Sequence, residues 1–512
     1  MKYLLGIDLG TSSVKTILVD QEGRMIGSET AGYPLEQPFP GWAEQNPKVW
    51  WYATVAALDG LFKKSGVDPR QIEGIGLSGQ MHGSVFLDEN KQVLRPAILW
   101  CDQRTAAECE WIEKNVGPEK WNRWVANRPL TGFTAPKILW VKKHEPEIYR
   151  HIRHILLPKD YIRFRLTGEL ATEVSDASGT LLFDVVRRTW SKEMFDVLDI
   201  PADWMPAAHE SHFVSSVITS EVADRLGLKK GVPVVGGGGD NAAGAVGTGV
   251  VKTGRVLVSL GTSGVVFAHS DQPLVDIENR LHSFCHAVAG KWHTMGVILS
   301  AAECLKWWRT NVGQQEEQIA KQSGRSVYDV MCEAADTVPP GSNGLLFLPY
   351  LLGERTPYAD PDARGAFIGM TLRHDKAAMT RAVLEGVAFA LRDSLEIMKQ
   401  LQIPLSEIRV TGGGAKSKVW RQIIADIMGI EVVSLAVDEG PAYGAALLAG
   451  EGAGLYPSVE EACENFIRTE DRILPNPERL QRYDEYYKIY RQMYGVLQNQ
   501  FHRLSELEKQ QY

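Results

Sequence analysis

The tetrapeptide Leu-Gly-Thr-Ser occurs twice in this chain of 512 residues, at Leu9–Ser12 and again at Leu260–Ser263. Each copy lies between two short apolar runs, "YLLGID" and "VKTILVD" in the first case and "RVLVS" and "GVVFAHS" in the second. Apolar runs on both sides of a glycine-containing turn predict a β-hairpin. Because a chain this long exceeds one ordinary core, the repeated hairpin predicts a duplicated architecture. We expect two domains of related plan, spanning residues 1–248 and 249–512.

Both halves continue with a third strand, "RMIGSET" and "KWHTMGV", and then alternate helical and strand-like segments. The clearest helical patterns run over residues 47–64, 417–429, 441–451 and 479–510. Strands that alternate with helices are typical of α/β folds with a largely parallel sheet. The sequence therefore predicts an α/β protein built from two similar halves.

The composition excludes several classes of function. A net charge of −8 argues against a nucleic-acid-binding surface, and no uncharged apolar run reaches the roughly 18 residues of a membrane span. Six scattered cysteines without Cys-x-x-Cys spacing fit a reducing cytoplasm. His282, Cys285 and His286 could suggest zinc, but without a fourth ligand a core strand is the better reading.

The two hairpin turns are candidate phosphate-binding sites. A Gly-Thr-Ser turn presents backbone N–H groups and hydroxyls on the inside of a tight bend, where phosphate oxygens can bind. Thr11 and Ser12 occupy the first turn, and Gly261 and Thr262 the second. Asp8, directly before the first turn, can reach Mg²⁺ through its water shell. Taken singly, each turn favours phosphate binding only slightly over a purely structural hairpin; two matching turns favour it more strongly.

A third glycine-rich turn, "TGGGAKSKVWRQ", lies between a predicted strand and a predicted helix. Backbone N–H groups at such a helix start can meet a phosphate or the flat face of a nucleoside. The spacing matches neither a Walker loop nor G-x-G-x-x-G. A plain strand-to-helix corner is an equally good reading.

The segment "GGGGDNAAG" places Asp240 after four glycines. An N-cap aspartate is common but needs no such run of glycines before it. A carboxylate at the floor of a ligand site does benefit from small neighbours. In phosphoryl transfer to an alcohol, a carboxylate accepts the hydroxyl proton. We therefore expect Asp240 to be a catalytic base.

The loop "GQMHG" exposes Gln80, Met81 and His82 between two glycines at a strand end, where α/β folds place ligands. His82 can bond hydroxyl groups and Met81 can pack against the carbon edge of a sugar. In "WCDQR", Trp100 and Asp102 are candidates for the same site, with a surface pair between Asp102 and Arg104 as the equal alternative.

These motifs together resemble the FGGY family of carbohydrate kinases over essentially the whole chain. "GFTAPKILWVKKH" at residues 132–144 matches one family signature, and "GAFIGMTLRHDKAAMTRAVLE" at residues 365–385 resembles the other, with Ala378 where a polar residue is usual. The segments "GQMHG", "PKDY", "GGGGDNAAGAVG", "LGTSGV", "HSFCHA" and "GERTP" strengthen the resemblance.

The resemblance implies the actin-like ATPase fold, with two ribonuclease-H-like domains around a deep cleft, and the reaction of ATP with a ketose, D-xylulose, in the presence of Mg²⁺. The implied catalytic residues are Asp240, as general base, and Asp8, which also serves the metal. The implied sugar contacts are Gln80, Met81, His82, Trp100, Asp102, Asp240 and Asn241. The implied nucleotide contacts are Thr11, Ser12, Gly261, Thr262, Gly413 and Gly414. Lys418 stands where some relatives carry Asn, so no adenosine contact is assigned to it.

Three other readings compete. A sibling kinase for ribulose, gluconate or glycerol would share the fold and Asp240, so only the sugar loop argues against it. If the chain were an actin-like ATPase that couples hydrolysis to assembly or chaperoning, the "GQMHG" loop would have no evident role. An idle sugar sensor is disfavoured by the presence of both Asp8 and Asp240. The sequence leaves the oligomeric state open, a homodimer included.

Overall fold

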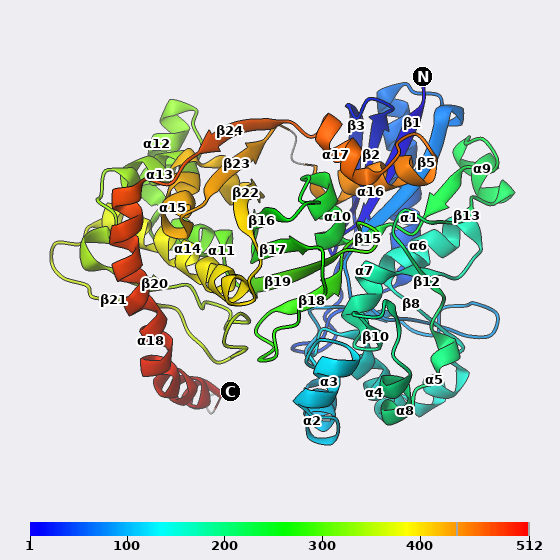
Figure 1. The fold of residues 1–512 in the computed structure, drawn as a ribbon, viewed down its shortest axis with the longest axis horizontal. Coiled ribbons are helices and arrows are strands. Elements are labelled where there is room, and N and C mark those ends of the chain that lie inside the picture. The colour runs from blue at the N-terminus through cyan, green and yellow to red at the C-terminus, as the bar shows by residue number, and fades with distance from the viewer. Residues whose placement is uncertain (437–438, 510–512) are drawn as a thin grey trace. The chain divides into compact units, whose positions relative to one another are not determined.

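A computed structural model describes residues 1–436 and 439–509 of the chain (Figure 1). The chain forms two compact units. The first contains residues 1–252, 269–293 and 439–467, and the second contains residues 253–268, 294–438 and 468–512. Val437, the last residue of the expected strand "EVVSLAV", and Gln510, the last residue of the expected tail helix, lie outside the described residues.

The first unit is built on a mixed sheet with the order β13-β14-β5-β1-β2-β3, and β15 also pairs with β5. The predicted hairpin and third strand are confirmed: β1 runs antiparallel to β2, and β2 runs antiparallel to β3. β5, β14 and β15 extend the sheet by parallel pairing. The strands are β1 (Tyr3–Leu9), β2 (Ser13–Asp20), β3 (Met25–Gly32), β5 (Ile72–Gly79), β13 (Val214–Val217), β14 (Pro233–Val235) and β15 (Gly238–Gly239).

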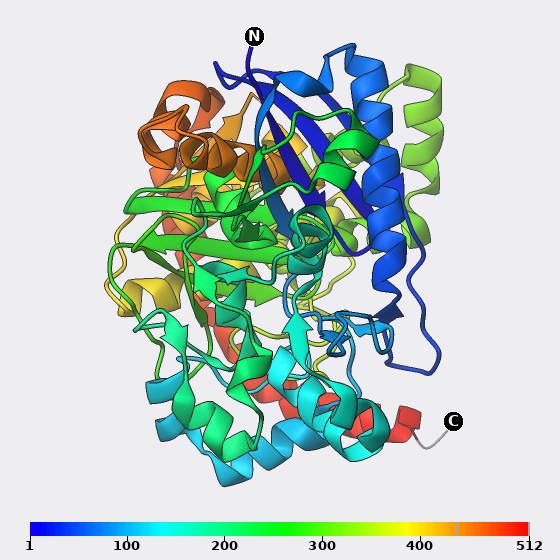
Figure 2. The same cartoon turned by 90° about the vertical axis from the view of Figure 1, so that its right-hand side faces the viewer.

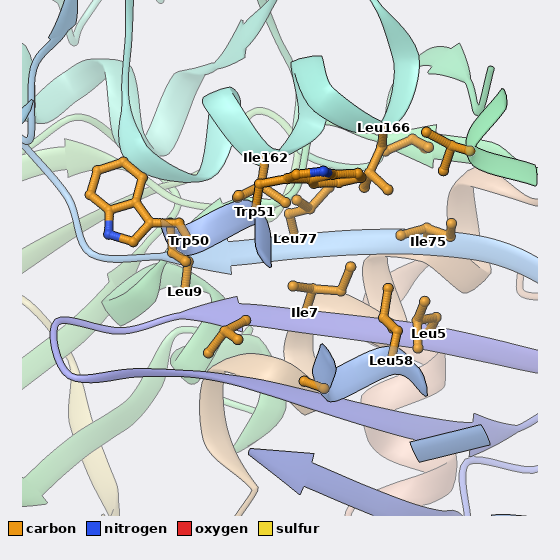
Figure 3. Packing of buried hydrophobic residues seen from close by; sticks show 14 of the residues in the cluster. Leu5, Ile7, Leu9, Trp50, Trp51, Leu58, Ile75, Leu77, Ile162 and Leu166 are labelled. Carbon is orange, nitrogen blue, oxygen red and sulfur yellow. The ribbon is translucent and has the colours of Figure 1, made fainter. Parts of the chain in front are cut away.

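One face of this sheet packs against helices α1 and α6 (Figures 2 and 3). Alternate residues of β1 and β5 point toward these helices, as the two-residue period of a strand requires. The labelled side chains of this core are Leu5, Ile7, Leu9, Ile75, Leu77, Trp50, Trp51, Leu58, Ile162 and Leu166. The helices of the first unit are α1 (Pro47–Ser65), α2 (Ala106–Asn115), α3 (Pro118–Trp124), α4 (Thr134–His144), α5 (Pro146–His151), α6 (Pro158–Thr167), α7 (Val174–Ala177), α8 (Lys192–Leu198), α9 (Ser220–Leu226), α10 (Asp240–Gly247), α16 (Gly440–Gly452) and α17 (Val459–Phe466).

The other face of the sheet is covered by α16, which comes from the second half of the sequence. Glycines replace side chains where this helix crosses the strands: a Cβ on Gly6 or Gly76 would run into the backbone carbonyl of Ala442 or Ala445. The units therefore interleave along the chain, whereas we expected two consecutive segments, 1–248 and 249–512. The sequence pattern identified the helix, but its partner is set by tertiary contacts.

The second unit repeats the plan of the first. Its strands pair in the order β19-β17-β16-β22-β23-β24, with β16 antiparallel to β17 and parallel to β22. The hairpin β16–β17 thus corresponds to β1–β2, and β22 corresponds to β5, which agrees with the predicted duplication. The strands are β16 (Gly254–Leu260), β17 (Gly264–Ser270), β19 (Trp292–Ile298), β22 (Leu405–Thr411), β23 (Glu431–Leu435) and β24 (Thr469–Ile473).

Helix α14 forms the centre of the second unit, with most of its residues buried. The long helix α18 turns four tyrosines inward, where their hydroxyls bond buried polar groups; these are Tyr483, Tyr487, Tyr490 and Tyr494. The helices of this unit are α11 (Ala302–Val312), α12 (Gln314–Ser323), α13 (Val327–Asp336), α14 (Lys376–Gln400), α15 (Lys418–Met428) and α18 (Pro477–Lys509). Among the described residues, no helix is both long enough and apolar enough to cross a bilayer.

Candidate active site

Three parallel strand ends bring the predicted acidic residues to one edge of the first sheet. Asp8 on β1 lies opposite Ser78 on β5, and Ser78 in turn lies opposite Gly238 on β15. Asp240 follows two residues later as the first residue of α10, whose N-cap is Gly239. β1 and β15 both pair with β5 and run in the same direction, so Asp8 at the end of β1 and Asp240 just after β15 lie at the same end of the sheet.

The surroundings of both carboxyls favour their neutral form. Burial and the nearby Asp8 charge raise the pKa of Asp240 to about 7, although its Oδ1 accepts hydrogen bonds from the backbone N–H (2.7 Å) and side-chain amide (2.9 Å) of Asn241. Burial also raises the pKa of Asp8 to about 6, against the opposing effects of Ser78 and Lys15. A carboxylate with a pKa near neutrality suits proton acceptance at physiological pH.

The loop after β5 holds His82 in a fixed orientation. His82 has a positive φ of 67°, and its Nδ1 donates to the carbonyl oxygen of Gly179 at 2.7 Å. A carbonyl oxygen only accepts, so Nδ1 carries the hydrogen of this bond. When the ring is neutral, Nε2 is then a hydrogen-bond acceptor. Met81 packs beside Gly239, where a Cβ would lie 2.8 Å from the methionine sulfur. Gly239, the residue before Asp240, therefore makes room for Met81.

Gln80 is buried and serves the hairpin turn rather than the surface of the site. Its Oε1 accepts from the Thr11 hydroxyl at 3.3 Å, and its Nε2 donates to Gln45 Oε1 at 3.3 Å. The Thr11 hydroxyl also accepts from the indole N–H of Trp100 at 2.9 Å. The prediction of Gln80 as a sugar contact gains no support from this geometry. Ser12, a predicted nucleotide contact, is exposed at the tip of the turn.

The side chain of Asp102 forms an ion pair inside the protein. Its side chain is fully buried, its Oδ2 accepts from the backbone N–H of Ala43 at 2.6 Å, and Arg104 binds both of its oxygens. Arg104 also stacks on Trp42, 3.6 Å from the ring centroid. The pair between Asp102 and Arg104 that the sequence offered as the alternative is therefore present, but it is buried rather than at the surface, because Trp42 covers Arg104. The interpretation of Asp102 as a sugar contact stays a prediction that gains no support from this geometry.

Two supporting residues escaped sequence reasoning. The hydroxyl of Thr134 and the ammonium of Lys137 both donate to the carbonyl oxygen of His82, at 3.0 and 2.9 Å. Lys137 is completely buried, and burial lowers its pKa to about 7. The sequence did offer one sign of this role, a lysine on the apolar face of α4, because a charged residue is rarely buried unless its charge is paired.

The second unit contains a pocket of about 540 Å³ at the carboxyl end of β22. The turn after β22 forms part of its lining, and a Cβ on Gly413 in this turn would meet no protein atom within 4 Å. α11, α13 and α15 supply the walls. The lining residues are Thr262, Ala302, Glu303, Leu305, Lys306, Ser326, Tyr328, Asp329, Cys332, Gly413, Gly414, Lys416, Ser417 and Trp420.

This pocket unites three of the predicted nucleotide contacts, Thr262, Gly413 and Gly414. Gly261 lies beside it, and its carbonyl oxygen accepts from the N–H of Ala302 at 2.9 Å. Lys418 is not among the lining residues; it is largely exposed and lies 4.0 Å from Asp471.

The histidines near Cys285 belong to the core. His282 and Cys285 lie in β18 (His282–Cys285), and His286 follows it, fully buried. Within residues 1–436 and 439–509, no group of three His, Cys, Asp or Glu side chains is placed to hold a metal ion. The reading of this segment as a core strand is confirmed over the described part of the chain.

A duplicated α/β protein with matching hairpins, an acidic pair at one sheet edge and a separate nucleotide-sized pocket has the features of an actin-like phosphotransferase. The family model of the FGGY carbohydrate kinase N-terminal domain matches residues 3–247, and that of the C-terminal domain matches residues 256–453. The chain belongs to the FGGY family of carbohydrate kinases, and its fold is the actin-like fold with two ribonuclease-H-like domains.

Individual relatives extend over nearly the whole chain. The chain is 43% identical to the xylulose kinase of Escherichia coli, with 96% of this chain and 99% of the relative covered. It is 41% identical to the xylulose kinase of Bacillus subtilis, covering 96% and 97%. The crystal structure of a xylulose kinase from Brucella ovis superimposes with a TM-score of 0.89 at 39% identity, covering 97% and 99%.

Proposed function

We propose that this protein phosphorylates D-xylulose with ATP, giving D-xylulose 5-phosphate and ADP. The observation that carries the proposal is the meeting of Asp240, Met81 and His82 at one sheet edge beside Asp8. Relatives that are 41% and 43% identical over nearly their whole length are xylulose kinases, which supports the choice of sugar.

In this mechanism Asp240 accepts the proton of the sugar's terminal hydroxyl. The oxygen forms a bond to the γ-phosphorus of ATP while the bond to the bridging oxygen breaks, and ADP leaves with that electron pair. The Asn241 amide and N–H hold the carboxylate oxygen, so the group is oriented before the sugar binds. His82 and Met81 fix the sugar by a hydrogen bond and an apolar contact.

The residues at the first hairpin fit a magnesium ion. Asp8 offers a carboxylate, whose Oδ1 is buried, directly before the turn proposed to hold phosphate. Mg²⁺ usually takes one or two carboxylates together with substrate phosphates and water, so a cage of three protein ligands is not required. The ion would neutralise charge on the phosphate oxygens, and Asp8 would hold it.

For the nucleotide, we propose that the pocket of the second unit takes the adenosine part of ATP. Its apolar walls, including Leu305 and Trp420, suit a base, and the exposed turn at Gly413 allows backbone to approach the ligand. The N–H groups of Ser12, Gly261 and Thr262 remain predicted phosphate contacts.

The substrate is tested by ADP release, coupled to an indicator enzyme, with D-xylulose, D-ribulose, D-gluconate and glycerol as acceptors. In a sugar site fixed by His82, binding of the epimer D-ribulose would leave a buried hydrogen-bonding group without a partner. D-ribulose should therefore be roughly 10- to 100-fold poorer in kcat/KM than D-xylulose. D-xylulose is expected to be the best acceptor. A clear preference for ribulose, gluconate or glycerol would leave the family standing and make the proposed substrate wrong. Cytoplasmic location and a homodimer remain predictions, to be checked by fractionation and light scattering.

A further inference from the structure

One short segment of the first unit touches both loops of the proposed sugar site. This segment, which we call the connector, comprises α7 (Val174–Ala177) and the following 3-10 turn, residues 178–180. At one end the hydroxyl of Ser175 accepts a hydrogen bond from the backbone N–H of Gly239 at 3.0 Å. At the other end the carbonyl oxygen of Gly179 accepts from His82 Nδ1 at 2.7 Å.

The connector is anchored by buried charges. The carboxylate of Glu173 accepts the backbone N–H groups of Ser175 (2.7 Å) and Asp176 (2.8 Å). The ammonium of Lys159 lies 3.2 Å from Asp176, 3.4 Å from Glu173 and 2.8 Å from Asp160, and none of these side chains is exposed. In such a network, separating one partner from the others would leave an uncompensated buried charge, which is costly. This cost holds the anchor of the connector in one geometry.

Lys159 also adjoins the sugar loop itself. A Cβ on Gly79, the residue before Gln80, would lie 3.1 Å from the Cβ of Lys159. The anchor of the connector and the start of the sugar loop therefore pack directly against each other.

The peptide before Asp240 is held from two sides. On one side Gly239 pairs with Gly79 of β5, and on the other its N–H reaches Ser175. Gly239 has no side chain that could restrict its backbone, so these contacts set the direction in which the next residue, Asp240, leaves the strand.

We infer that Ser175 is a positioning residue for the catalytic base: its hydroxyl fixes the Gly239 peptide and thereby the carboxylate of Asp240. The inference rests on the proposed function, since it requires Asp240 to be the base. Ser175 acts through Gly239 and is given no contact with sugar or nucleotide.

Replacing Ser175 with alanine leaves the Gly239 N–H without its acceptor. Misplacement of a reacting group by about 1 Å can cost on the order of 100-fold in rate, and loss of one neutral hydrogen bond corresponds to roughly tenfold. We expect Ser175→Ala to lower kcat about tenfold while the KM for ATP stays within twofold of the wild type. Ser175→Thr keeps the hydroxyl and should recover most of the rate.

A matched control separates positioning from stability. Ser191 is also a buried serine of the first unit whose hydroxyl accepts a backbone N–H, that of Met194 at 3.3 Å, but it caps α8. Ser191→Ala should lower the melting temperature about as much as Ser175→Ala and leave kcat unchanged. Equal losses of kcat in both alanine variants would overturn the inference, because the effect would then follow stability.

A double-mutant cycle tests the route through the base. If Ser175 acts through Asp240, adding Ser175→Ala to Asp240→Asn should lower the residual rate less than threefold. A further tenfold loss would show that Ser175 acts elsewhere. Near-normal turnover of Asp240→Asn alone would overturn the base assignment and this inference with it. A slow Asp240→Asn beside a normal Ser175→Ala would overturn the inference only.

Discussion

Replacement of Asp240 by asparagine should slow the enzyme and stabilise the fold at alkaline pH. The asparagine retains an oxygen for the two hydrogen bonds from Asn241 but accepts no proton. Turnover should fall by about 100-fold or more, the usual size of general-base catalysis. The kcat/KM of the wild type should rise with pH through about 7, because Asp240 must be ionised to act and its pKa is raised to about 7.

The stability gain follows from the same pKa. An aspartate raised from 3.8 to about 7 by burial and Asp8 binds a proton in the folded state that the unfolded chain has already lost. Its ionisation therefore lowers the free energy of unfolding as the pH rises from about 4 to 7. At 1.36 kcal/mol per unit, the full cost is at most about 4 kcal/mol above pH 7 and about 1.6 kcal/mol at pH 5.

The assay is denaturant unfolding of the wild type and Asp240→Asn at pH 8 and at pH 5. Asp224→Asn serves as the control, because Asp224 is an exposed carboxylate of the same unit. Asp240→Asn should gain more than twice as much at pH 8 as at pH 5, and Asp224→Asn should change little at either. An equal gain at both pH values, or a loss at pH 8, would refute the raised pKa of Asp240.

Two further variants test other parts of the account. A Cβ at Gly261 would meet no protein atom closer than 3.6 Å, so Gly261→Val should fold. If phosphate lies against this backbone, the variant should bind ATP at least tenfold more weakly by calorimetry. ATP binding equal to that of the exposed control Gly495→Val would show that the hairpin is structural only. Tyr487→Phe removes the hydroxyl that donates to buried Asp393 at 2.6 Å, and the free energy of unfolding in denaturant should fall by about 1–3 kcal/mol. Tyr52→Phe, at an exposed position, should change the free energy of unfolding little. Equal effects of the two substitutions would contradict a stabilising role for the buried tyrosines of α18.

The sequence predicted the local elements well where their patterns were self-contained. Both hairpins, helix α1 and the strand-to-helix turn at Gly413 occur where expected, because alternation and turn residues act over a few positions. The position of α16 on the first sheet was not predictable in this way. Its small residues match glycines of β1 and β5 that are hundreds of positions away in the chain.

The sequence indicated the candidate site residues through strand-end motifs, but it did not reveal the residues that support them. Asp8 lies near the end of β1, and His82 and Asp240 come shortly after β5 and β15, which a linear pattern reveals. Gln80 and Asp102 occur in equally suggestive motifs, yet their side chains are buried in internal hydrogen bonds. Which polar side chain of a loop faces a ligand depends on the residues that cover it, and those come from distant segments.

The central claim is transfer of phosphate from ATP to the terminal hydroxyl of D-xylulose, and product identification by phosphorus NMR tests it most directly. The purified protein is incubated with ATP, Mg²⁺ and D-xylulose, and the spectrum is followed as ATP is consumed. The account predicts one new phosphomonoester signal, coupled to the protons at carbon 5 of the sugar, in an amount equal to the ADP formed. ADP and inorganic phosphate without a sugar ester, or an ester at another carbon, would contradict it.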